Sequence, residues 1–306
     1  MSVKVVAPAH LHAGNFDLTG DMGRLYGTVG FALDVPIEVR VREGEARANE
    51  KWAERFVRFF AEKLGVSVEA EVRSEVPPLA GMGYVTGVAL AIGMGISKLF
   101  DFGWSVEDVA LIVKRGLITS LGVHAFRCGG FIVEGGFRVD RREKMVPPLI
   151  FRGEVPEDWK FVVAVPEDEA RRIAEMRERA EDEILSSLKT MPAEMSDRLS
   201  RIVLVKIIPA FVEGDLNTFA EGLTMFNSLL GEFWSEYQGS KYCCPVVEKG
   251  VELMIARTGC GCQSSWGPAF YTITTPEVAR ELAKELEEIA GRVFVASANN
   301  EGARYG

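Results

Sequence analysis

The sequence predicts an α+β fold, and two patterns support this prediction. Segments in which apolar and polar residues alternate, which is typical of half-buried strands, are interspersed with segments of helical periodicity. Towards the C-terminus a helix, a strand, a second helix and a second strand follow one another, which indicates a layer of helices packed on a sheet. A chain of 306 residues can form one large domain or two moderate ones.

Strand and helix signals follow one another along the first half of the chain. The expected elements are a strand at the N-terminus, a strand over 37–42, an amphipathic helix over 51–64, a strand over 66–72, a buried helix over 86–99, a helix over 106–114 and a hairpin or bent strand over 131–139. Ser105 is expected to cap the 106–114 helix, because Asp108 three residues later resembles the second half of a capping box.

A cluster of prolines and glycines between residues 145 and 157 predicts a boundary between an N-terminal domain, 1–150, and a C-terminal domain, 151–306. The elements expected after it are a strand over 161–165, a charged helix over 167–188, two helices ending near Trp234, a helix over 246–257, a strand over 269–274, a helix over 276–290 and a strand over 293–298. Pro276 suits the first position of its helix, where the missing N–H removes no helical hydrogen bond.

Composition and charge exclude several classes of protein. Apolar residues make up 47% of the chain, enough for a sizeable core. The net charge is −9 and no cluster of lysine and arginine stands out, so nucleic acid is not expected as a partner. Apolar segments such as 85–96 are shorter than the roughly 20 residues of a membrane span. The N-terminus reads as a strand and not as a signal peptide, so we expect a cytoplasmic protein with no membrane partner.

Four of the five cysteines form close pairs, Cys243 with Cys244 and Cys260 with Cys262, while Cys128 stands alone. Neither pair has the spacing of a structural zinc site, so no metal is expected. Free thiols are the favoured interpretation. A disulfide or a metal joining the two pairs stays open if the chain comes from a hyperthermophile.

Two loops have the composition of ligand-binding segments. The glycine loop, residues 77–87, precedes the buried helix, and Gly81, Gly83 and Thr86 could present backbone N–H groups to a phosphate. The segment 258–268 contributes hydroxyls, an amide and an indole, so Gln263, Ser264, Ser265 and Trp266 are candidates for substrate binding. Tight structural turns are the alternative for both loops. We expect the two loops to face one cleft.

Two further segments supply candidate site residues. His10 and His12 lie on the same face of the first strand, and His12, Asp17 and Arg24 are candidate catalytic residues. A metal held by the two histidines is not favoured, because only Asp17 could supply a third ligand nearby. The segment 115–126 is rich in small and hydroxyl residues, and Thr119 and Ser120 could contact a phosphate.

Taken together and in this order, these segments resemble the β-ribofuranosylaminobenzene 5′-phosphate synthase family, a branch of the GHMP kinase superfamily. The resemblance runs from about residue 8 to residue 304. It is strongest at 11–12, 17–18, 23–24, 129–136 (GGFIVEGG), 213–215 (EGD), 237–239 (YQG), 263–268 (QSSWGP) and 300–304 (NEGAR).

The resemblance implies a two-domain GHMP kinase-like fold whose glycine loop binds phosphate. It implies an archaeal transferase of methanopterin biosynthesis that couples phosphoribosyl pyrophosphate to a 4-substituted benzoate, releasing pyrophosphate and carbon dioxide. Mg²⁺ is the implied cofactor, and a small phosphorylated molecule is the implied partner. From its residue type, Trp266 is expected to stack on the aromatic ring. A homodimer stays open.

The sequence departs from the family pattern at several positions. In the glycine loop Tyr84 replaces a small hydroxyl residue and Val85 replaces a glycine, while His10 stands where an arginine is expected. Ser120 replaces a glycine and Arg127 replaces an acidic residue. Tyr84 is expected to bring bulk into the phosphate pocket, with packing of its side chain into the core as the alternative. Two alternatives therefore stay open, an ATP-dependent GHMP small-molecule kinase and a non-catalytic metabolite-binding paralogue.

Overall fold

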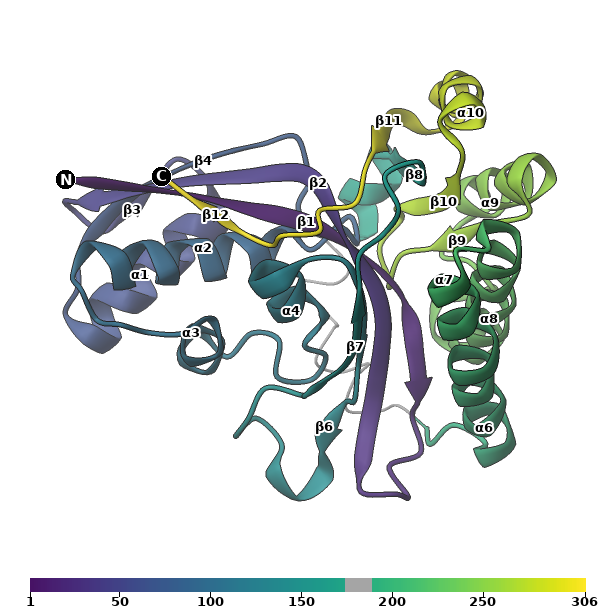
Figure 1. Cartoon of the computed structure of the whole chain (residues 1–306). Helices are drawn as coiled ribbons and strands as arrows, with labels where there is room; N and C mark the ends of the chain where they lie inside the picture. The colour runs from purple at the N-terminus through teal and green to yellow at the C-terminus, as the bar shows by residue number, and fades with distance from the viewer. Residues whose placement is uncertain (174–188) are drawn as a thin grey trace.

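Two long antiparallel strands, β1 (Ser2–Asp17) and β2 (Arg24–Glu43), run through the computed structural model, which describes residues 1–173 and 189–306 (Figure 1). They belong to an eight-stranded sheet whose main path has the order β12-β1-β2-β4-β3. The other strands of this sheet are β3 (Arg47–Ala48), β4 (Val68–Ser74), β5 (Phe131–Glu134), β6 (Phe137–Arg138), β7 (Leu149–Gly153) and β12 (Arg304–Tyr305).

Four helices accompany this sheet, α1 (Lys51–Leu64), α2 (Tyr84–Leu99), α3 (Val106–Val113) and α4 (Leu121–Cys128). Helix α2 packs directly on β1 and β2 and is buried along nearly its whole length, as its continuous apolar sequence requires. Helix α3 begins with the expected capping box, in which the backbone N–H of Asp108 donates to Ser105 Oγ at 3.0 Å.

A second sheet of four strands has the order β11-β8-β10-β9. Its strands are β8 (Lys160–Pro166), β9 (Cys262–Gln263), β10 (Phe270–Thr274) and β11 (Gly291–Ala296). Alternate residues of β8 face different cores, because Val162 and Ala164 pack with α9 (Pro245–Thr258) and α10 (Pro276–Ala290), whereas Phe161 and Val163 pack towards the first sheet. A strand covered on both faces explains the unbroken apolar sequence of β8.

The remaining helices are α6 (Ala193–Ile202), a π-helical turn (Val203–Ile207), α7 (Ile208–Glu213) and α8 (Leu216–Gln238). Together with α9 and α10 they lie on the opposite side of the long strands from α1–α4 (Figure 1). Phe31 of β2 joins the two sheets, with ring centroids 5.1 Å from Phe161 of β8 and 6.0 Å from Phe219 of α8. A single aromatic core therefore supports both sheets.

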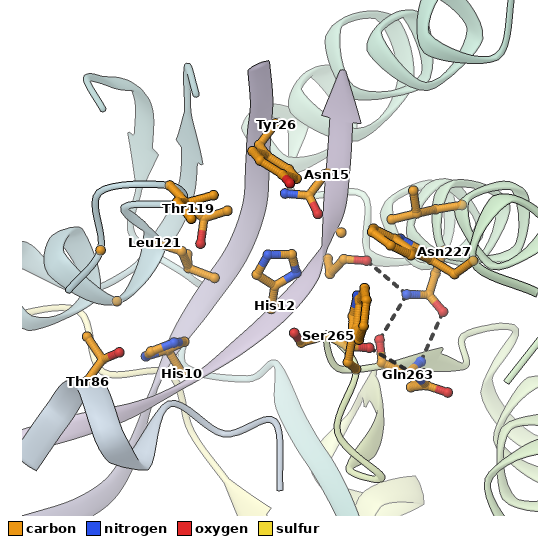
Figure 2. Close-up of a pocket in the computed structure, with 18 of the residues that line it drawn as sticks. His10, His12, Asn15, Tyr26, Thr86, Thr119, Leu121, Asn227, Gln263 and Ser265 are labelled. Carbon is orange, nitrogen blue, oxygen red and sulfur yellow. Dashed lines mark hydrogen bonds between the residues drawn. The ribbon is translucent and has the colours of Figure 1, made fainter. Parts of the chain in front are cut away.

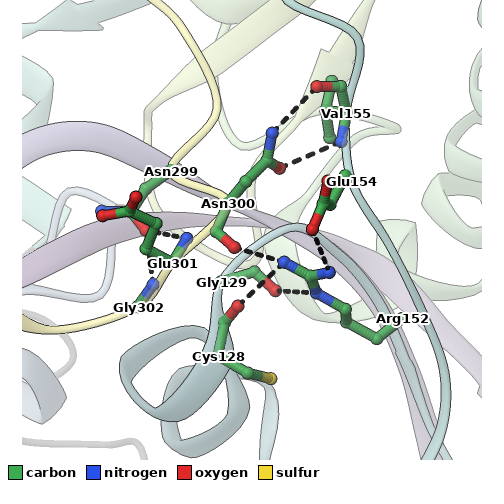
Figure 3. A network of polar contacts seen from close by, with 9 residues as sticks. All are labelled: Cys128, Gly129, Arg152, Glu154, Val155, Asn299, Asn300, Glu301 and Gly302. Atoms are coloured by element: carbon green, nitrogen blue, oxygen red, sulfur yellow. Dashed lines mark hydrogen bonds and ion pairs between the residues drawn. The ribbon is translucent and has the colours of Figure 1, made fainter.

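The C-terminal residues return to the first sheet, where β12 pairs with β1. On the way, the side chain of Asn300 accepts a hydrogen bond from Val155 N and donates one to Val155 O, both at 3.0 Å. The Arg152 guanidinium donates to the carbonyls of Cys128 and Asn300 (Figure 3). These contacts connect the end of α4 to the C-terminal segment.

The predicted α+β class and most predicted elements are confirmed, including the exact span of the 51–64 helix. The hairpin alternative for 131–139 is wrong, because β5 and β6 both pair with β2 and are separated by a bend at Gly136, whose φ is +66°. The charged helix is present over 167–173, and the rest of its predicted span lies outside the described residues. Strand β7 crosses residue 150 and pairs with β5, and the division into two domains stays a prediction.

No helix among the described residues has the length and apolar character needed to cross a membrane.

We predict that Asn300→Ala destabilises the fold by about 1–3 kcal/mol, because the substitution leaves both backbone groups of Val155 without their partner. Urea unfolding followed by circular dichroism measures the effect. The neighbouring exposed residue provides the control: Glu301→Ala should change the free energy of unfolding by less than about 0.5 kcal/mol. Equal effects of the two substitutions would contradict the role assigned to Asn300.

Candidate active site

A cavity of about 360 Å³ opens where β1, the first turns of α2 and α4, helix α8 and the 263–266 loop meet. Figure 2 shows His12 in its centre, with Thr119 and Leu121 on one side and Gln263 and Asn227 on the other. Residues from both sheets line it, so it combines segments that are far apart in the chain. A concave site of this size suits a small-molecule ligand.

Strand β1 forms the floor of the cavity. His10 and His12 lie on the same face of the strand, as the two-residue period requires, and both line the cavity. The pairing with β2 shifts register between His12 and Gly14. This irregularity places Ala13, Gly14 and Asn15 along the cavity as well. A side chain at Gly14 would overlap Leu230, so glycine lets α8 approach the strand closely.

The buried hydroxyl of Ser264 connects three segments behind the cavity. It accepts a hydrogen bond from the backbone N–H of His12 at 3.0 Å and donates one to the carbonyl of Gly81 at 2.6 Å. Two backbone bonds reinforce the connection, from Ser265 N to His12 O at 3.1 Å and from Ala269 N to Ala80 O at 2.9 Å. The sequence predicted that the two loops face one cleft. Thr86 of the glycine loop and Gln263, Ser265 and Trp266 do line the cavity, whereas Gly81 bonds directly to Ser264 behind it.

Asn227 holds helix α8 against the same junction. Its amide Nδ2 donates to Ala13 O at 2.8 Å and to Gln263 O at 2.9 Å, and its Oδ1 accepts from Gln263 N at 3.0 Å (Figure 2). A buried amide with three good hydrogen bonds fixes the relative position of the elements that it joins.

One side of the cavity is suited to anions, and we call it the anion wall. Its residues are Thr86, Lys114, Arg115, Thr119, Leu121 and Gly122. The first turns of α2 and α4 both reach this wall, and helix N-termini attract negative charge through their free N–H groups and their dipoles. Arg115 lies among them, with Nη2 3.4 Å from Thr86 Oγ1. Two helix ends and two cationic side chains converge here.

The imidazole of His10 occupies the space between these two helix ends. A Cβ added at Gly83, the N-cap of α2, would overlap the ring, and a Cβ at Gly122 in α4 would lie 2.7 Å from it. Burial, with smaller contributions from His12 and Arg115, lowers the pKa of His10 to about 3. The ring is therefore neutral at physiological pH and serves as a packing group, not as a cation.

The opposite side of the cavity, which we call the tryptophan wall, is formed by Leu230, Gly231, Trp234, Gln238, Lys241 and Trp266. The rings of Trp234 and Trp266 meet edge to face, with centroids 4.7 Å apart and an angle of 67° between their planes. Gln263 supports this wall, because its Oε1 accepts from Cys243 N at 2.8 Å and its Nε2 donates to Ser265 O at 2.9 Å. The wall offers aromatic faces and edges to a planar ligand.

Backbone strain is concentrated at the cavity. Six non-glycine residues of the described chain have φ between 53° and 79°, namely Tyr26, Leu79, Asp101, Lys114, Glu143 and Ser265. Four of these six line the cavity. Side chains rarely adopt this conformation because their Cβ atoms clash with the backbone, and retained strain commonly marks a functional site.

The comparisons with known proteins agree with this architecture. The family model described as "GHMP kinases C terminal" matches residues 207–291. Homoserine kinase from Cytophaga hutchinsonii superposes with a TM-score of 0.65 at 15% identity, covering 100% of this chain and 97% of that chain. Mevalonate diphosphate decarboxylase from Enterococcus faecalis superposes with a TM-score of 0.68 at 12% identity, covering 100% and 99%. The chain has the GHMP kinase fold.

Sequence comparison identifies relatives of the chain within this fold. The chain is 29% identical to β-ribofuranosylphenol 5′-phosphate synthase from Methanothermobacter thermautotrophicus, covering 97% of this chain and 96% of the relative. It is also 29% identical to the protein of the same name from Archaeoglobus fulgidus, covering 98% of each chain. The chain is a divergent relative of these synthases. The resemblance inferred from the sequence motifs is thereby confirmed, with a phenol in place of an aminobenzene in the name of these relatives.

The structure of this synthase relative brings together only part of the predicted site. His12, Thr86, Thr119, Gln263, Ser265 and Trp266 line the cavity. Ser264, Gly81 and Gly83 lie behind its surface, where Ser264 and Gly81 bond to each other and Gly83 packs on His10. Ser120 is buried and donates to Pro147 O at 3.0 Å. Asp17 and Arg24 border a separate depression near Met22.

The expectation that Tyr84 fills the phosphate pocket is wrong. Tyr84 is buried in the core outside the cavity, and its hydroxyl bonds to Glu50 at the start of α1. Burial, and then the nearby Glu50 carboxylate, raise the pKa of this phenol. Tyr84 therefore connects α2 to α1, and His10 occupies the space next to the helix end.

Several cavity residues were missed by reasoning from the sequence. Asn227 carried a signal, because it is a polar residue within the apolar face formed by Leu223, Phe226 and Leu230. Lys241 and Trp234 carried no local signal, since a lysine after a helix and a tryptophan within one are common. Their role depends on the packing of α8 against β1.

No disulfide joins the cysteines. All five carry free thiols, and Cys243 Sγ lies 3.9 Å from Cys244 Sγ. Within residues 1–173 and 189–306, no group of three or more His, Cys, Asp and Glu side chains is arranged to hold a metal ion.

Glu134 is a fully buried carboxyl beside the cavity floor. Its partner across the sheet is Thr28, whose hydroxyl accepts from Asn15 Nδ2 at 3.1 Å, and Asn15 lines the cavity. Gly136 N donates to Glu134 Oε2 at 2.7 Å. Burial raises the pKa of Glu134 to about 7, although the hydroxyls of Thr28 and Ser120 and the N–H groups of Gly136 and Ser120 offset part of the effect.

We predict that Ser264→Ala destabilises the protein by about 1–3 kcal/mol, because it removes two hydrogen bonds of a buried hydroxyl, to the His12 N–H and to the Gly81 carbonyl. Urea unfolding measures the change. Ser265→Ala is the matched control and should cost less than about 0.5 kcal/mol, because no hydrogen bond of its hydroxyl is lost within the described residues. If Ser264→Ala is as stable as the control, the three-segment connection is not significant for folding.

We also predict a pH-dependent difference between the wild type and Glu134→Gln. The folded state retains the proton of Glu134 up to about pH 7, whereas the unfolded state releases it near pH 4.5. The stability of the wild type should therefore fall relative to the variant as pH rises through this window, by about 3 kcal/mol in total. Thermal and urea unfolding between pH 4 and 8 measure the difference, with the exposed Glu157→Gln as control. A constant difference across this range would exclude the raised pKa.

Proposed function

We propose that the protein transfers a phosphoribosyl group from phosphoribosyl pyrophosphate to a 4-substituted benzoate, releasing pyrophosphate and carbon dioxide. The observation that carries this proposal is one cavity with two chemically different sides, the anion wall and the tryptophan wall. A donor with several phosphate charges suits the anion wall, and an aromatic acceptor suits the tryptophan wall. The names of the relatives, which contain both a ribofuranosyl phosphate and a phenol, support it.

The donor would bind on the anion wall. Arg115 and Lys114 would neutralise phosphate oxygens, and Thr119 and Thr86 could donate hydroxyl hydrogen bonds to them. The N-terminus of α4 adds a favourable dipole, whereas the His10 ring covers the N-terminus of α2. In a site that excludes water, these fixed charges and dipoles stabilise the negative charge that develops on the leaving group.

The transfer step balances without an external oxidant or base. The bond between ribose C1 and the pyrophosphate oxygen breaks, and pyrophosphate leaves with the electron pair. The ring carbon that bears the carboxylate forms the new bond to C1. The bond from that carbon to the carboxylate then breaks, its electrons restore the aromatic ring, and carbon dioxide departs.

Mg²⁺ is the cofactor implied by the resemblance, and the cavity fits it only as an ion shared with the donor. Glu143 is the carboxylate that lines the cavity within the described residues. Mg²⁺ commonly binds through one or two carboxylates together with substrate phosphates, so Glu143 and the donor pyrophosphate would hold it. Bound there, it would supply charge neutralisation for the leaving group.

The geometry of the glycine loop argues against the ATP-dependent kinase alternative. A nucleotide phosphate at the N-terminus of α2 would have to displace the neutral ring of His10, which packs on Gly83 and Gly122. The non-catalytic alternative is less favoured because strained residues and two chemically different walls surround one cavity. By the same resemblance, the proposed reaction belongs to methanopterin biosynthesis.

The expected result of an assay with phosphoribosyl pyrophosphate, Mg²⁺ and carboxyl-labelled 4-hydroxybenzoate or 4-aminobenzoate is release of labelled carbon dioxide and pyrophosphate in equal amounts. Arg115→Met should raise the KM for the donor at least tenfold, because a charge-assisted contact contributes about 1.5–3 kcal/mol. Arg127→Met, an exposed residue that pairs with Glu107, is the control and should change little. Absence of label release by the wild type, or consumption of ATP in place of the donor, would refute the proposal.

A further inference from the structure

Lys241 lies on the tryptophan wall and is held there by α8. Gln238 Nε2 donates to the backbone carbonyl of Lys241 at 2.7 Å. A Cβ added at Gly231 would lie 2.8 Å from that carbonyl oxygen and 3.0 Å from Lys241 Cγ, so the stem of the lysine packs directly on the helix. The residue is half-buried and lines the cavity together with Trp234 and Trp266.

The ammonium group of Lys241 forms no ion pair with a carboxylate of the described residues. By contrast, Lys189 and Lys206 on the same side of the molecule pair with Glu236 and Glu221 at 2.8 Å. Glu143 is the carboxylate that lines the cavity within the described residues, and it follows β6 in the N-terminal half. Its Oε1 lies 3.9 Å from Arg142 Nε. A half-buried cation without a counter-ion favours binding of an anion from solution.

The chemistry around Lys241 points to a particular anion. The anion wall has two cations and the N-terminus of α4, which suit a phosphate, whereas the tryptophan wall has one cation beside two indoles, Leu230 and the amide of Gln238. A single cation beside aromatic surfaces matches a ligand with one negative charge and a planar ring. An aromatic carboxylate has both features.

We propose that Lys241 is the specificity-determining residue that binds the carboxylate of the acceptor while the acceptor ring lies against Trp266 and Trp234. This inference rests on the proposed function and names the residue that selects the acceptor. The contact also suits the outcome of the reaction. The carboxylate leaves as neutral carbon dioxide, so the attraction between Lys241 and the acceptor's carboxylate exists for the substrate and is lost once the ring has been decarboxylated.

The test compares Lys241→Met, which keeps the length of the stem, with Lys249→Met on the outer side of α9 and with Lys241→Arg. Binding of 4-hydroxybenzoate and of its uncharged isostere 4-hydroxybenzamide is measured by quenching of tryptophan fluorescence. Lys241→Met should weaken binding of the benzoate at least tenfold and change binding of the benzamide less than twofold. Lys241→Arg should stay within a few-fold of the wild type for both ligands, and Lys249→Met should be unchanged.

Steady-state kinetics distinguishes an effect on the benzoate from an effect on the donor, phosphoribosyl pyrophosphate. Lys241→Met should raise the KM for the benzoate at least tenfold with a smaller change in kcat, and should leave the KM for phosphoribosyl pyrophosphate unchanged. Equal binding of the benzoate by the wild type and Lys241→Met, or an equal rise in the KM of the donor, would overturn the role of Lys241 while the proposed reaction stands. A wild type that neither binds nor decarboxylates the benzoate would overturn the proposed function itself.

Discussion

The hydroxyl of Ser264 makes two buried hydrogen bonds, and the cavity depends on both of them. Through this one atom the 263–266 loop is joined to β1 at His12 and to the glycine loop at Gly81. Asn227 then joins helix α8 to the same loop and to β1. Because these groups are buried, each lost bond would leave a polar atom without water or partner, so the elements around the cavity have little freedom to separate.

The two sides of the cavity come from different halves of the chain, and the shared aromatic core around Phe31 keeps them in place. The anion wall is built on helix N-termini next to the first sheet, and the tryptophan wall is built on α8 and the 263–266 loop. Strained backbone at Tyr26 and Ser265 persists between them. Such strain is retained only where surrounding packing enforces it, which fits a site whose geometry matters for binding.

The glycine loop has a different use here from the one that its position before a helix indicates. His10 covers the helix end as a neutral ring, while Tyr84 turns into the core and bonds to Glu50. The loop thus contributes Thr86 to the cavity and otherwise supports the packing of α2 against β1 and the 263–266 loop. Anion binding then depends more on Arg115, Lys114 and the first turn of α4 than on the loop itself.

The sequence by itself determined the α+β class, most element boundaries and the family resemblance. Periodicity and capping are local properties, so the helix over 51–64 and the Ser105 capping box could be predicted from neighbouring residues alone. Only the tertiary structure decided which candidates share a cavity. Asp17 and Arg24 lie close to His12 in sequence, yet they border another depression, whereas Lys241 and Asn227 reach the cavity from more than two hundred residues away. The register shift after His12 and the close approach of α8 at Gly14 determine which residues line the cavity. Both features depend on contacts between distant segments, which no local pattern encodes.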